Sequence, residues 1–351
     1  MNVVKLWVSS FRNLSEVVLE PAPGGLTVIQ GPNGSGKTSL LEALGYCSTL
    51  KSFRGVPRES LIQAGQRSAE LACDVDYGGR LIDIAVRIED GRRDRATRSG
   101  QRVESSRDLL EVLRTTLFTP DDLEIVKGGP AGRRDLLDDA IAATSPRGAA
   151  DRQELERILR QLGSRMSDEA ASTLDVWDAR LATTGERVAR SREQMVDSLQ
   201  PFAAEAFAAI APSSGALELR YVRSFVGDLA SAVAAAREDD LRRQVTTVGP
   251  QRDDLDIRVG GLDGRTRLSQ GRQRATALAL RLATHHYLTE LTGTTPLLLL
   301  DDAFSELDDA TSRRLVHELP RGQALLTSAA GSLPPAARAD AVIRLRDGRL
   351  S

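Results

Sequence analysis

The chain is poor in cysteine and aromatic residues, and it has no long hydrophobic run. Its 351 residues include 2 cysteines, Cys47 and Cys73, and 3 histidines, which rules out a disulfide framework and shows no zinc-ligand spacing. No apolar stretch approaches the roughly 20 residues that a membrane-spanning helix needs. The first ten residues, MNVVKLWVSS, lack the charged and apolar regions of a secretory signal. We therefore expect a cytoplasmic protein without a membrane segment.

Lysine is the scarcest charged residue. Only Lys5, Lys37, Lys51 and Lys127 occur among the 47 basic residues, and the rest are arginine. A GC-rich genome accounts for such a bias, and a lysine retained against it marks a position where the ammonium group itself is needed. The net charge is -2, so any surface for nucleic acid must be a local patch.

Hydrophobic periodicity divides the chain into a β-rich first third, a helical middle and an α/β last third. Val28 and Ile29 belong to a short buried strand that runs directly into glycine, and Gly78-Gly79 joins two alternating strands. Asp228 has the position of a helix N-cap. We expect strands at 2–8, 26–30, 69–76, 80–89, 216–222, 254–261, 296–300 and 324–328, and helices near 37–48, 155–166, 174–181, 201–211, 228–245 and 270–291.

These changes of pattern predict three segments. Residues 1–128 form a first lobe, residues 129–247 a mainly helical insertion, and residues 248–351 return to α/β and complete the first lobe. The insertion is far too short for a long coiled coil.

A phosphate-binding loop follows the strand at 26–30. GPNGSGKT, from Gly31 to Thr38, matches G-x-x-x-x-G-K-[ST] and stands between a strand and a helix, as the motif requires. Its glycines allow the backbone to wrap an anion, and the amides at the helix start add partial positive charge. Lys37 reaches the phosphates and Thr38 gives its hydroxyl to Mg²⁺. The predicted ATP-binding residues of this loop are Gly31, Pro32, Asn33, Gly34, Ser35, Gly36, Lys37 and Thr38.

Two adjacent carboxylates end the strand LLLL near residue 300. Asp301 suits the shell of Mg²⁺ together with Thr38, and Asp302 suits a catalytic residue that orients the attacking water. A second anion site is predicted by LSQGRQR, in which Ser269 stands at a helix start. Nothing near this second site in the sequence supplies a substrate.

Taken in order, these motifs resemble those of ABC and SMC ATPases. SFRNL (10–14) resembles the start of SMC-like DNA-repair ATPases, where it lies near the nucleotide. Five finer stretches resemble the RecF family of bacterial recombination mediators over essentially the whole chain: LKSFRG (50–55), FTPDDLEIVKGGPAGRRDLLD (118–138), VGPQRDDL (248–255), SQGRQR (269–274) and LLLLDDAFSELD (297–308). The resemblance implies an α/β fold, an ABC-type P-loop ATPase head with mixed sheets around the P-loop helix and an inserted, mainly helical arm. It also adds Arg12 and Asn13 to the nucleotide site.

The resemblance further implies that ATP closes two heads face to face. The signature residues Ser269, Gln270, Gly271 and Gln273 would then act in trans on the partner's nucleotide, beside a D-loop with Ser305 and Asp308. The closed homodimer would bind DNA at gaps or junctions, cooperate with RecR and RecO in loading RecA, and serve replication-fork maintenance and the SOS response.

The chain departs from the family pattern at several positions. Arg272 stands where the family has glutamine, and Gln251 stands where it has histidine. Asp302 is shorter than the usual glutamate, and Thr327 or Ser328 stands where transporters have a histidine. These two departures predict slow ATP hydrolysis that acts as a switch. Gln63 and Gln66 are the two candidates for a Q-loop glutamine.

The densest basic segment, residues 87–107, is the predicted DNA contact. Mobile arginines suit phosphate binding without base readout, whereas interleaved acidic residues equally fit a solvated hairpin. The candidate residues are Arg92, Arg93, Arg95, Arg98 and Arg102.

Three other classes of protein share some of these motifs. A transporter ATPase subunit shares the phosphate loop and the signature, but it has neither the SFRNL start nor the helical insertion. A chromosome-structure subunit needs a longer coiled coil, and an OLD-type nuclease needs a further acidic domain.

Overall fold

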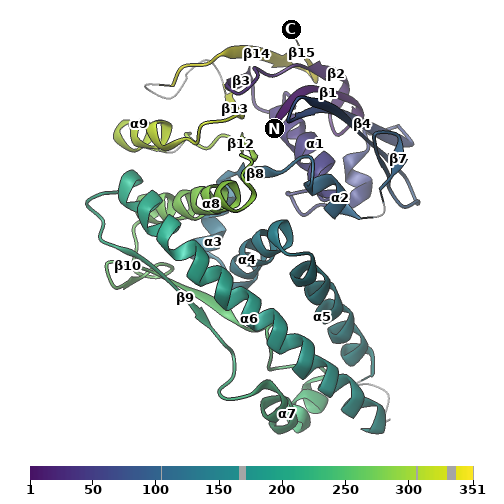
Figure 1. Cartoon of the computed structure of the whole chain (residues 1–351), viewed down its shortest axis with the longest axis vertical. Coiled ribbons are helices and arrows are strands. Elements are labelled where there is room, and N and C mark those ends of the chain that lie inside the picture. The colour runs from purple at the N-terminus through teal and green to yellow at the C-terminus, as the bar shows by residue number, and fades with distance from the viewer. Residues whose placement is uncertain (104, 166–170, 306, 330–336, 351) are drawn as a thin grey trace. The chain divides into compact units, whose positions relative to one another are not determined.

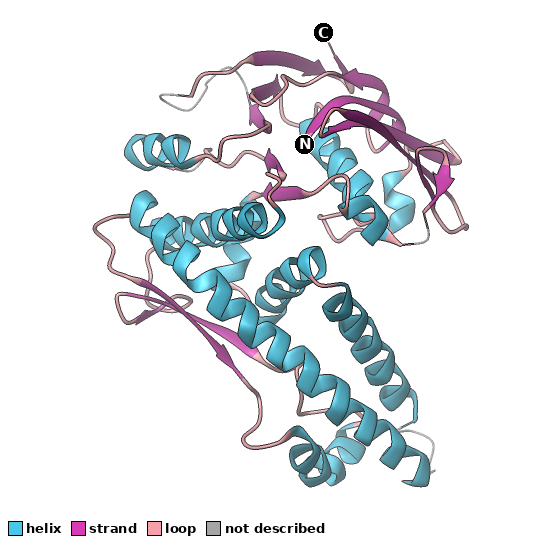
Figure 2. Ribbon diagram, in the orientation of Figure 1, coloured by secondary structure: helices cyan, strands magenta, loops and turns pink. Residues whose placement is uncertain are grey.

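The computed structural model describes residues 1–103, 105–165, 171–305, 307–329 and 337–350 (Figure 1). Packing divides the chain into two compact units. Unit 1 consists of Met1–Pro120 and Leu288–Ser351, and unit 2 consists of Asp121–Tyr287. The tripartite division at residues 128 and 247 follows motif order instead of packing, and it stays a prediction. Figure 2 shows that the two larger sheets belong to unit 1, whereas helices dominate unit 2.

The first sheet of unit 1 is antiparallel, with strand order β2-β1-β4-β5-β6-β7. The hairpin predicted at Gly78-Gly79 is confirmed: Tyr77 pairs with Arg80, and both glycines have positive φ, as a tight turn between twisted strands requires. The strands are β1 (Asn2–Phe11), β2 (Leu14–Leu19), β4 (Ser68–Tyr77), β5 (Arg80–Glu89), β6 (Arg95–Arg98) and β7 (Gln101–Arg102).

The second sheet has strand order β15-β14-β3-β13-β12-β8, and its strands are parallel except for β15. Helix α1 (Lys37–Thr49) contacts strands of both sheets and is buried over nearly its whole length. The N-terminal and C-terminal segments thus share one core around the helix that follows the phosphate loop. The strands are β3 (Leu26–Gly31), β8 (Thr115–Phe118), β12 (Leu297–Leu300), β13 (Ala324–Ala329), β14 (Ala341–Arg346) and β15 (Arg349–Leu350).

The described residues of unit 1 also form short helices. They are the 3-10 helix η1 (Arg58–Leu61), helix α2 (Ser106–Leu110) and helix α9 (Asp309–Glu318), and the 3-10 helix η2 (Pro120–Asp122) lies at the boundary with unit 2. Asp308 caps α9, because its carboxylate accepts a hydrogen bond from the backbone N–H of Thr311.

Unit 2 combines a helical core with a small antiparallel sheet. Helices α5 and α6 pack along each other around Leu155, Ile158 and Leu181, and Asp228 caps α7 as predicted. Its elements are α3 (Leu123–Lys127), α4 (Pro130–Thr144), α5 (Pro146–Arg165), α6 (Ala171–Ile210), α7 (Leu229–Arg243), α8 (Gln270–Thr292, whose last residues belong to unit 1), β9 (Leu217–Val222), β10 (Asp254–Val259) and β11 (Leu262–Asp263).

The separate helix expected to begin at Pro201 is wrong. Pro201 lies inside α6, which runs without interruption to Ile210. Proline removes one helical hydrogen bond and crowds the preceding turn. Here Pro201 is on the exposed side, while Leu199 and Ala203 are buried in the packed side. Packing of the buried face therefore outweighs the local preference for a break.

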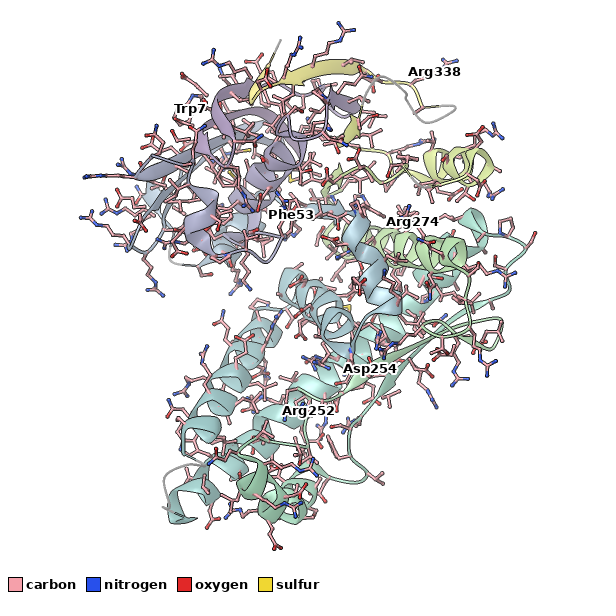
Figure 3. All side chains as sticks on the ribbon, turned by 180° about the vertical axis from the view of Figure 1, so that it is seen from behind. Trp7, Phe53, Arg252, Asp254, Arg274 and Arg338 are labelled. Atoms are coloured by element: carbon pink, nitrogen blue, oxygen red, sulfur yellow. The ribbon has the colours of Figure 1, made fainter. Side chains whose placement is uncertain are left out.

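The GPQRDDL segment is a structural junction of unit 2. The carboxylate of Asp253 is fully buried and accepts hydrogen bonds from the hydroxyl of Tyr221 and the backbone N–H of Ser224. Asp254, labelled in Figure 3, accepts a bidentate hydrogen bond from the guanidinium group of Arg133. Because buried charges are stable only when paired, this segment fixes β10 against α4.

Candidate nucleotide-binding site

The phosphate loop connects the end of β3 to the start of α1. Gly34 and Gly36 have φ of 81° and 107°, which disfavours any other residue. A Cβ at Gly36 would also lie 2.6 Å from the side chain of Leu14. The hydroxyl of Ser35 is buried and has no hydrogen-bond partner among the described residues. This geometry fits an anion held by loop amides and a hydroxyl.

Lys37 places a nearly buried ammonium group inside this loop. Its Nζ donates to the backbone carbonyls of Gly31 at 2.9 Å and Pro32 at 3.2 Å. Only 5% of the residue is exposed. Oxygens of a bound phosphate would accept these hydrogen bonds from Lys37 in place of the two carbonyls. The buried ammonium group would then have a charged partner.

Asp301 is the acceptor of two threonine hydroxyls. Its Oδ1 accepts from Thr38 at 2.9 Å and from Thr327 at 2.7 Å. Burial raises the pKa of Asp301, and the two hydroxyl donors oppose that rise. Oxygen ligands of this kind suit Mg²⁺, which usually takes one or two protein groups besides phosphate oxygens. Thr38 and Asp301 would hold the ion, as the sequence predicts.

Asp302 takes a left-handed backbone conformation, with φ of 45°. Its N–H donates to the hydroxyl of Thr327 at 3.0 Å, so Thr327 bridges the two neighbouring aspartates. Non-glycine residues rarely adopt this conformation, and they do so mainly where function requires it. The side chain of Asp302 lines the same pocket as Lys37.

Arg12 and Asn13 form part of the wall of the pocket. Arg12 donates through Nε and Nη2 to the fully buried carboxylate of Glu42, at 2.9 and 2.8 Å. Asn13 donates to the carbonyl of Gly34 at 2.8 Å and accepts from Ser39. Both residues therefore brace the loop. Sequence reasoning missed Glu42, although it lies one turn after Thr38.

The pocket bounded by these groups has a volume of about 680 Å³, within the usual range for a small-molecule site. The segment around η1 supplies part of its wall through Ser60, Ile62 and Ala64. The lining residues are Arg12, Asn13, Asn33, Gly34, Gly36, Lys37, Thr38, Ser39, Arg54, Ser60, Ile62, Ala64 and Asp302. Neither Gln63 nor Gln66 lines it, and the amide of Gln63 donates to Ser15.

The signature residues belong to unit 2, at the start of α8. Ser269, Gln270, Gly271 and Arg272 are exposed, whereas Gln273 is buried. The Nε2 of Gln273 donates to the carbonyls of Gly264 and Arg265, which fixes the preceding loop. Gln273 thus holds the segment that presents Ser269, and its own amide is occupied.

The two residues assigned to the D-loop have local partners in unit 1. Ser305 donates from its backbone N–H and its hydroxyl to the carbonyl of Asp302. Asp308 is the N-cap of α9, and the hydrogen bond from the backbone of Thr311 lowers its pKa.

The candidate DNA-contacting arginines lie on β6, β7 and the adjoining turns. Glu89 pairs with Arg92 and Arg95, and Arg98 pairs with Glu111. Arg93 and Arg102 are exposed, and no ion pair is found for either in the described part of the chain. Three of the five candidate arginines are therefore paired with a carboxylate, two with Glu89 of the hairpin and one with Glu111 at the end of α2.

Other kinds of site find little support in the described ranges. Cys47 and Cys73 are buried free thiols, and burial raises the pKa of both. Among the described residues, no three or more His, Cys, Asp or Glu side chains are grouped so that they could hold a metal ion. Within those same ranges no helix is long and apolar enough to cross a membrane.

This arrangement defines the class of the protein. A P-loop helix between an antiparallel and a mainly parallel sheet, with a second unit of helices, is a P-loop head of the ABC/SMC type. Comparison with known proteins agrees: the model for the RecF/RecN/SMC N terminal domain matches residues 2–330. The chain belongs to the RecF family.

Relatives at the level of sequence and of structure support this membership. The chain is 36% identical to the DNA replication and repair protein RecF of Streptomyces avermitilis, over 94% of each chain, and 36% identical to that of Acidothermus cellulolyticus, over 95% of each. A solved structure of the recombination mediator RecF with ATPrS, of the RecFOR pathway, has a TM-score of 0.91 at 28% identity and covers 100% of this chain and 97% of that one. An Smc head bound to ScpA has a TM-score of 0.59 at 19% identity, covering 100% and 96%, and shares the fold alone.

Proposed function

We propose that the chain is an ATP-gated, DNA-binding protein of replication and recombinational repair. The observation that carries this proposal is that Lys37 and Thr38 line one pocket of a RecF-type head, where the hydroxyl of Thr38 is bonded to Asp301. ATP binds there, with Lys37 on its phosphates and Mg²⁺ held by Thr38 and Asp301. Relatives described as RecF with ATP support the choice of nucleotide.

ATP binding drives two heads together on DNA. Ser269 is exposed at the start of α8, where its hydroxyl and the first amides of the helix form an anion site. In the dimer this site would contact the nucleotide bound by the partner copy, and each head would complete the other. Such an arrangement is isologous, with two nucleotides and two signature segments.

DNA is held by its backbone and without regard to sequence. The exposed Arg93 and Arg102, together with Arg92, Arg95 and Arg98, offer guanidinium groups to phosphates on one antiparallel hairpin. Few aromatic side chains are available for stacking on bases, which favours duplex and junction backbones. We propose gapped or junction DNA as the substrate.

Hydrolysis is slow and works as a release step. Asp302 is the proposed group that orients water, but its side chain is one methylene shorter than glutamate. Its backbone N–H donates to Thr327, a threonine in place of a histidine. The proposed cellular role is RecA loading with RecO and RecR and the SOS response, since relatives of the RecFOR pathway share this head. The transporter alternative is not favoured, because the relatives are replication and repair proteins.

ATP-dependent dimerisation on DNA tests this proposal. Molecular mass in solution is measured with and without a non-hydrolysable ATP analogue, in the presence and absence of gapped duplex DNA. We expect a monomer without nucleotide, a dimer with it, and a more stable dimer with both ligands. A mass that never responds to nucleotide contradicts the proposal, as does dimerisation that is indifferent to DNA.

A further inference from the structure

The turn between β5 and β6 is tied to the helix that follows the phosphate loop. Asp94, at the end of this turn, accepts a hydrogen bond from the hydroxyl of Tyr46 at 2.5 Å. Tyr46 belongs to α1 and is only 2% exposed. Burial and the neighbouring Asp94 raise the pKa of Tyr46, so its hydroxyl stays protonated and donates at neutral pH. The tether therefore lies in the core, where salt screens it little.

Arg58 ties the same turn to the wall of the nucleotide pocket. Its Nη1 lies 3.1 Å from Oδ1 of Asp94, and its Nη2 donates to the carbonyl of Glu89 at the opposite end of the turn. The carboxylate of Glu89 in turn pairs with Arg92 and Arg95. Arg58 thus holds the base of the loop that carries two candidate DNA-contacting arginines.

From Arg58 the connection to the nucleotide pocket is short. Arg58 is the first residue of η1, and Ser60 in the same 3-10 helix lines the pocket. The carbonyl of Ser60 accepts from Nη1 of Arg12, and the carbonyl of Leu61 accepts from the backbone N–H of Arg12. Hydrogen bonds and an ion pair thus connect the turn through Arg58 and η1 to Arg12 and the pocket wall.

We propose that Tyr46 and Arg58 are positioning residues that couple DNA binding at the β5–β6 turn to nucleotide binding in the P-loop pocket. This inference rests on the proposed function, since phosphates must engage Arg92 and Arg95. When DNA phosphates bind, Arg92 and Arg95 leave the carboxylate of Glu89 and pair with the phosphates. The turn is then held in one position. The change in the turn then affects α1 through the bond of Asp94 with Tyr46, and it affects η1 through Arg58.

Coupling of this kind is reciprocal, so one number describes it. The factor by which DNA tightens the binding of nucleotide equals the factor by which nucleotide tightens the binding of DNA. A residue that only stabilises the fold changes both single-ligand affinities or neither. A residue on the path lowers the coupling factor and leaves each single-ligand affinity nearly unchanged.

The test measures that factor in Tyr46→Phe. Affinity for a non-hydrolysable ATP analogue with Mg²⁺ is determined with and without saturating gapped duplex, and affinity for the duplex with and without the analogue. The matched control is Tyr221→Phe, which deletes the same type of hydroxyl-to-carboxylate bond, at 2.6 Å, in unit 2. Arg58→Gln is the second variant, used where Tyr46→Phe lowers folding yield.

We expect a factor of about 5 to 150 in the unmodified protein and a reduction of about 2- to 10-fold in Tyr46→Phe, which corresponds to one lost hydrogen bond. Tyr221→Phe should keep the original factor. An unchanged factor in both path variants overturns the inference, and so does a protein that binds both ligands without coupling. Failure of the unmodified protein to bind nucleotide or DNA at all overturns the proposed function itself.

Discussion

The hydroxyl of Thr38 donates a hydrogen bond to the carboxylate of Asp301 over 2.9 Å, although 263 positions separate the two residues in the chain. This contact joins the start of α1 to the end of β12, so the two ends of the sequence build one site. The proposed metal-binding pair exists only in the folded unit, and nucleotide affinity should depend on both partners.

Thr38→Val removes this hydroxyl and keeps the shape of the side chain. We expect Mg²⁺-dependent affinity for ATP to fall by roughly 10- to 100-fold, as when groups that orient a metal are lost. Calorimetric titration with Mg²⁺ and again with a chelator measures the change. Thr49→Val, at the far end of the same helix, is the control, because the hydroxyl of Thr49 bonds backbone groups near the end of the helix. Equal loss in both variants would contradict a metal role for Thr38.

The phosphate loop and the acidic strand end could be predicted from sequence because each is local. GPNGSGKT fixes a strand, a glycine loop and a helix start within eight positions, and LLLLDD fixes a buried strand and its acidic end. Contacts that join distant segments left no such pattern. Glu42 looks like one more polar residue on a helix, yet it is fully buried under Arg12.

The triple variant Arg92→Ala, Arg93→Ala, Arg95→Ala should weaken DNA binding equally for all sequences. Log affinity falls as log salt rises, and each lost phosphate contact makes this slope shallower by about 0.9 for duplex DNA. Fluorescence anisotropy at several salt concentrations gives both quantities. Arg242→Ala, Arg243→Ala on α7 is the control of similar charge. If the control lowers the slope as much as the triple variant, the hairpin is not the DNA contact.

His285 should make the protein sensitive to acid. Burial, with a smaller effect of His286, lowers the pKa of His285 to about 3 from its ordinary value of 6.5. The folded state favours the neutral form of His285. Its contribution to the free energy of unfolding is therefore fully present above pH 6.5 and is lost as the pH falls towards 3. Between pH 7 and pH 5 the free energy of unfolding should drop by about 2 kcal/mol from this residue.

Urea unfolding at the two pH values checks this expectation. His285→Gln should reduce the pH-dependent drop, because a buried amide does not titrate. His317→Gln, at an exposed position on α9, should leave the drop as it is. A drop that is identical in all three proteins would show that the acid sensitivity comes from carboxylates alone.

The Pro201 helix was mispredicted for a physical reason that applies to other long helices. The local sequence shows that Pro201 removes a hydrogen bond from the helix. It does not show the compensating burial of Leu199 and Ala203, which depends on partners far along the chain. The tether from Tyr46 to Asp94 is invisible in the same way, since 48 positions separate the two residues. Periodicity predicts which face is buried, but it does not predict what that face meets.

Ser269 is proposed to complete the nucleotide site of the partner copy, and a mixing experiment tests this role directly. Ser269→Arg keeps its own pocket but loses the signature, and Asp302→Asn binds nucleotide but lacks the group that orients water. Each should be inactive alone. Ser213→Arg, at another exposed serine of unit 2, controls for the added charge and should retain activity.

A mixed dimer of the two inactive variants contains one intact composite site. Equal amounts of the two should therefore recover about a quarter of the normal ATP hydrolysis rate, because half of the dimers are mixed and each has one working site. The rate is measured with gapped DNA present, at concentrations that permit dimerisation. A mixture no more active than its separate components would contradict completion of the site in trans.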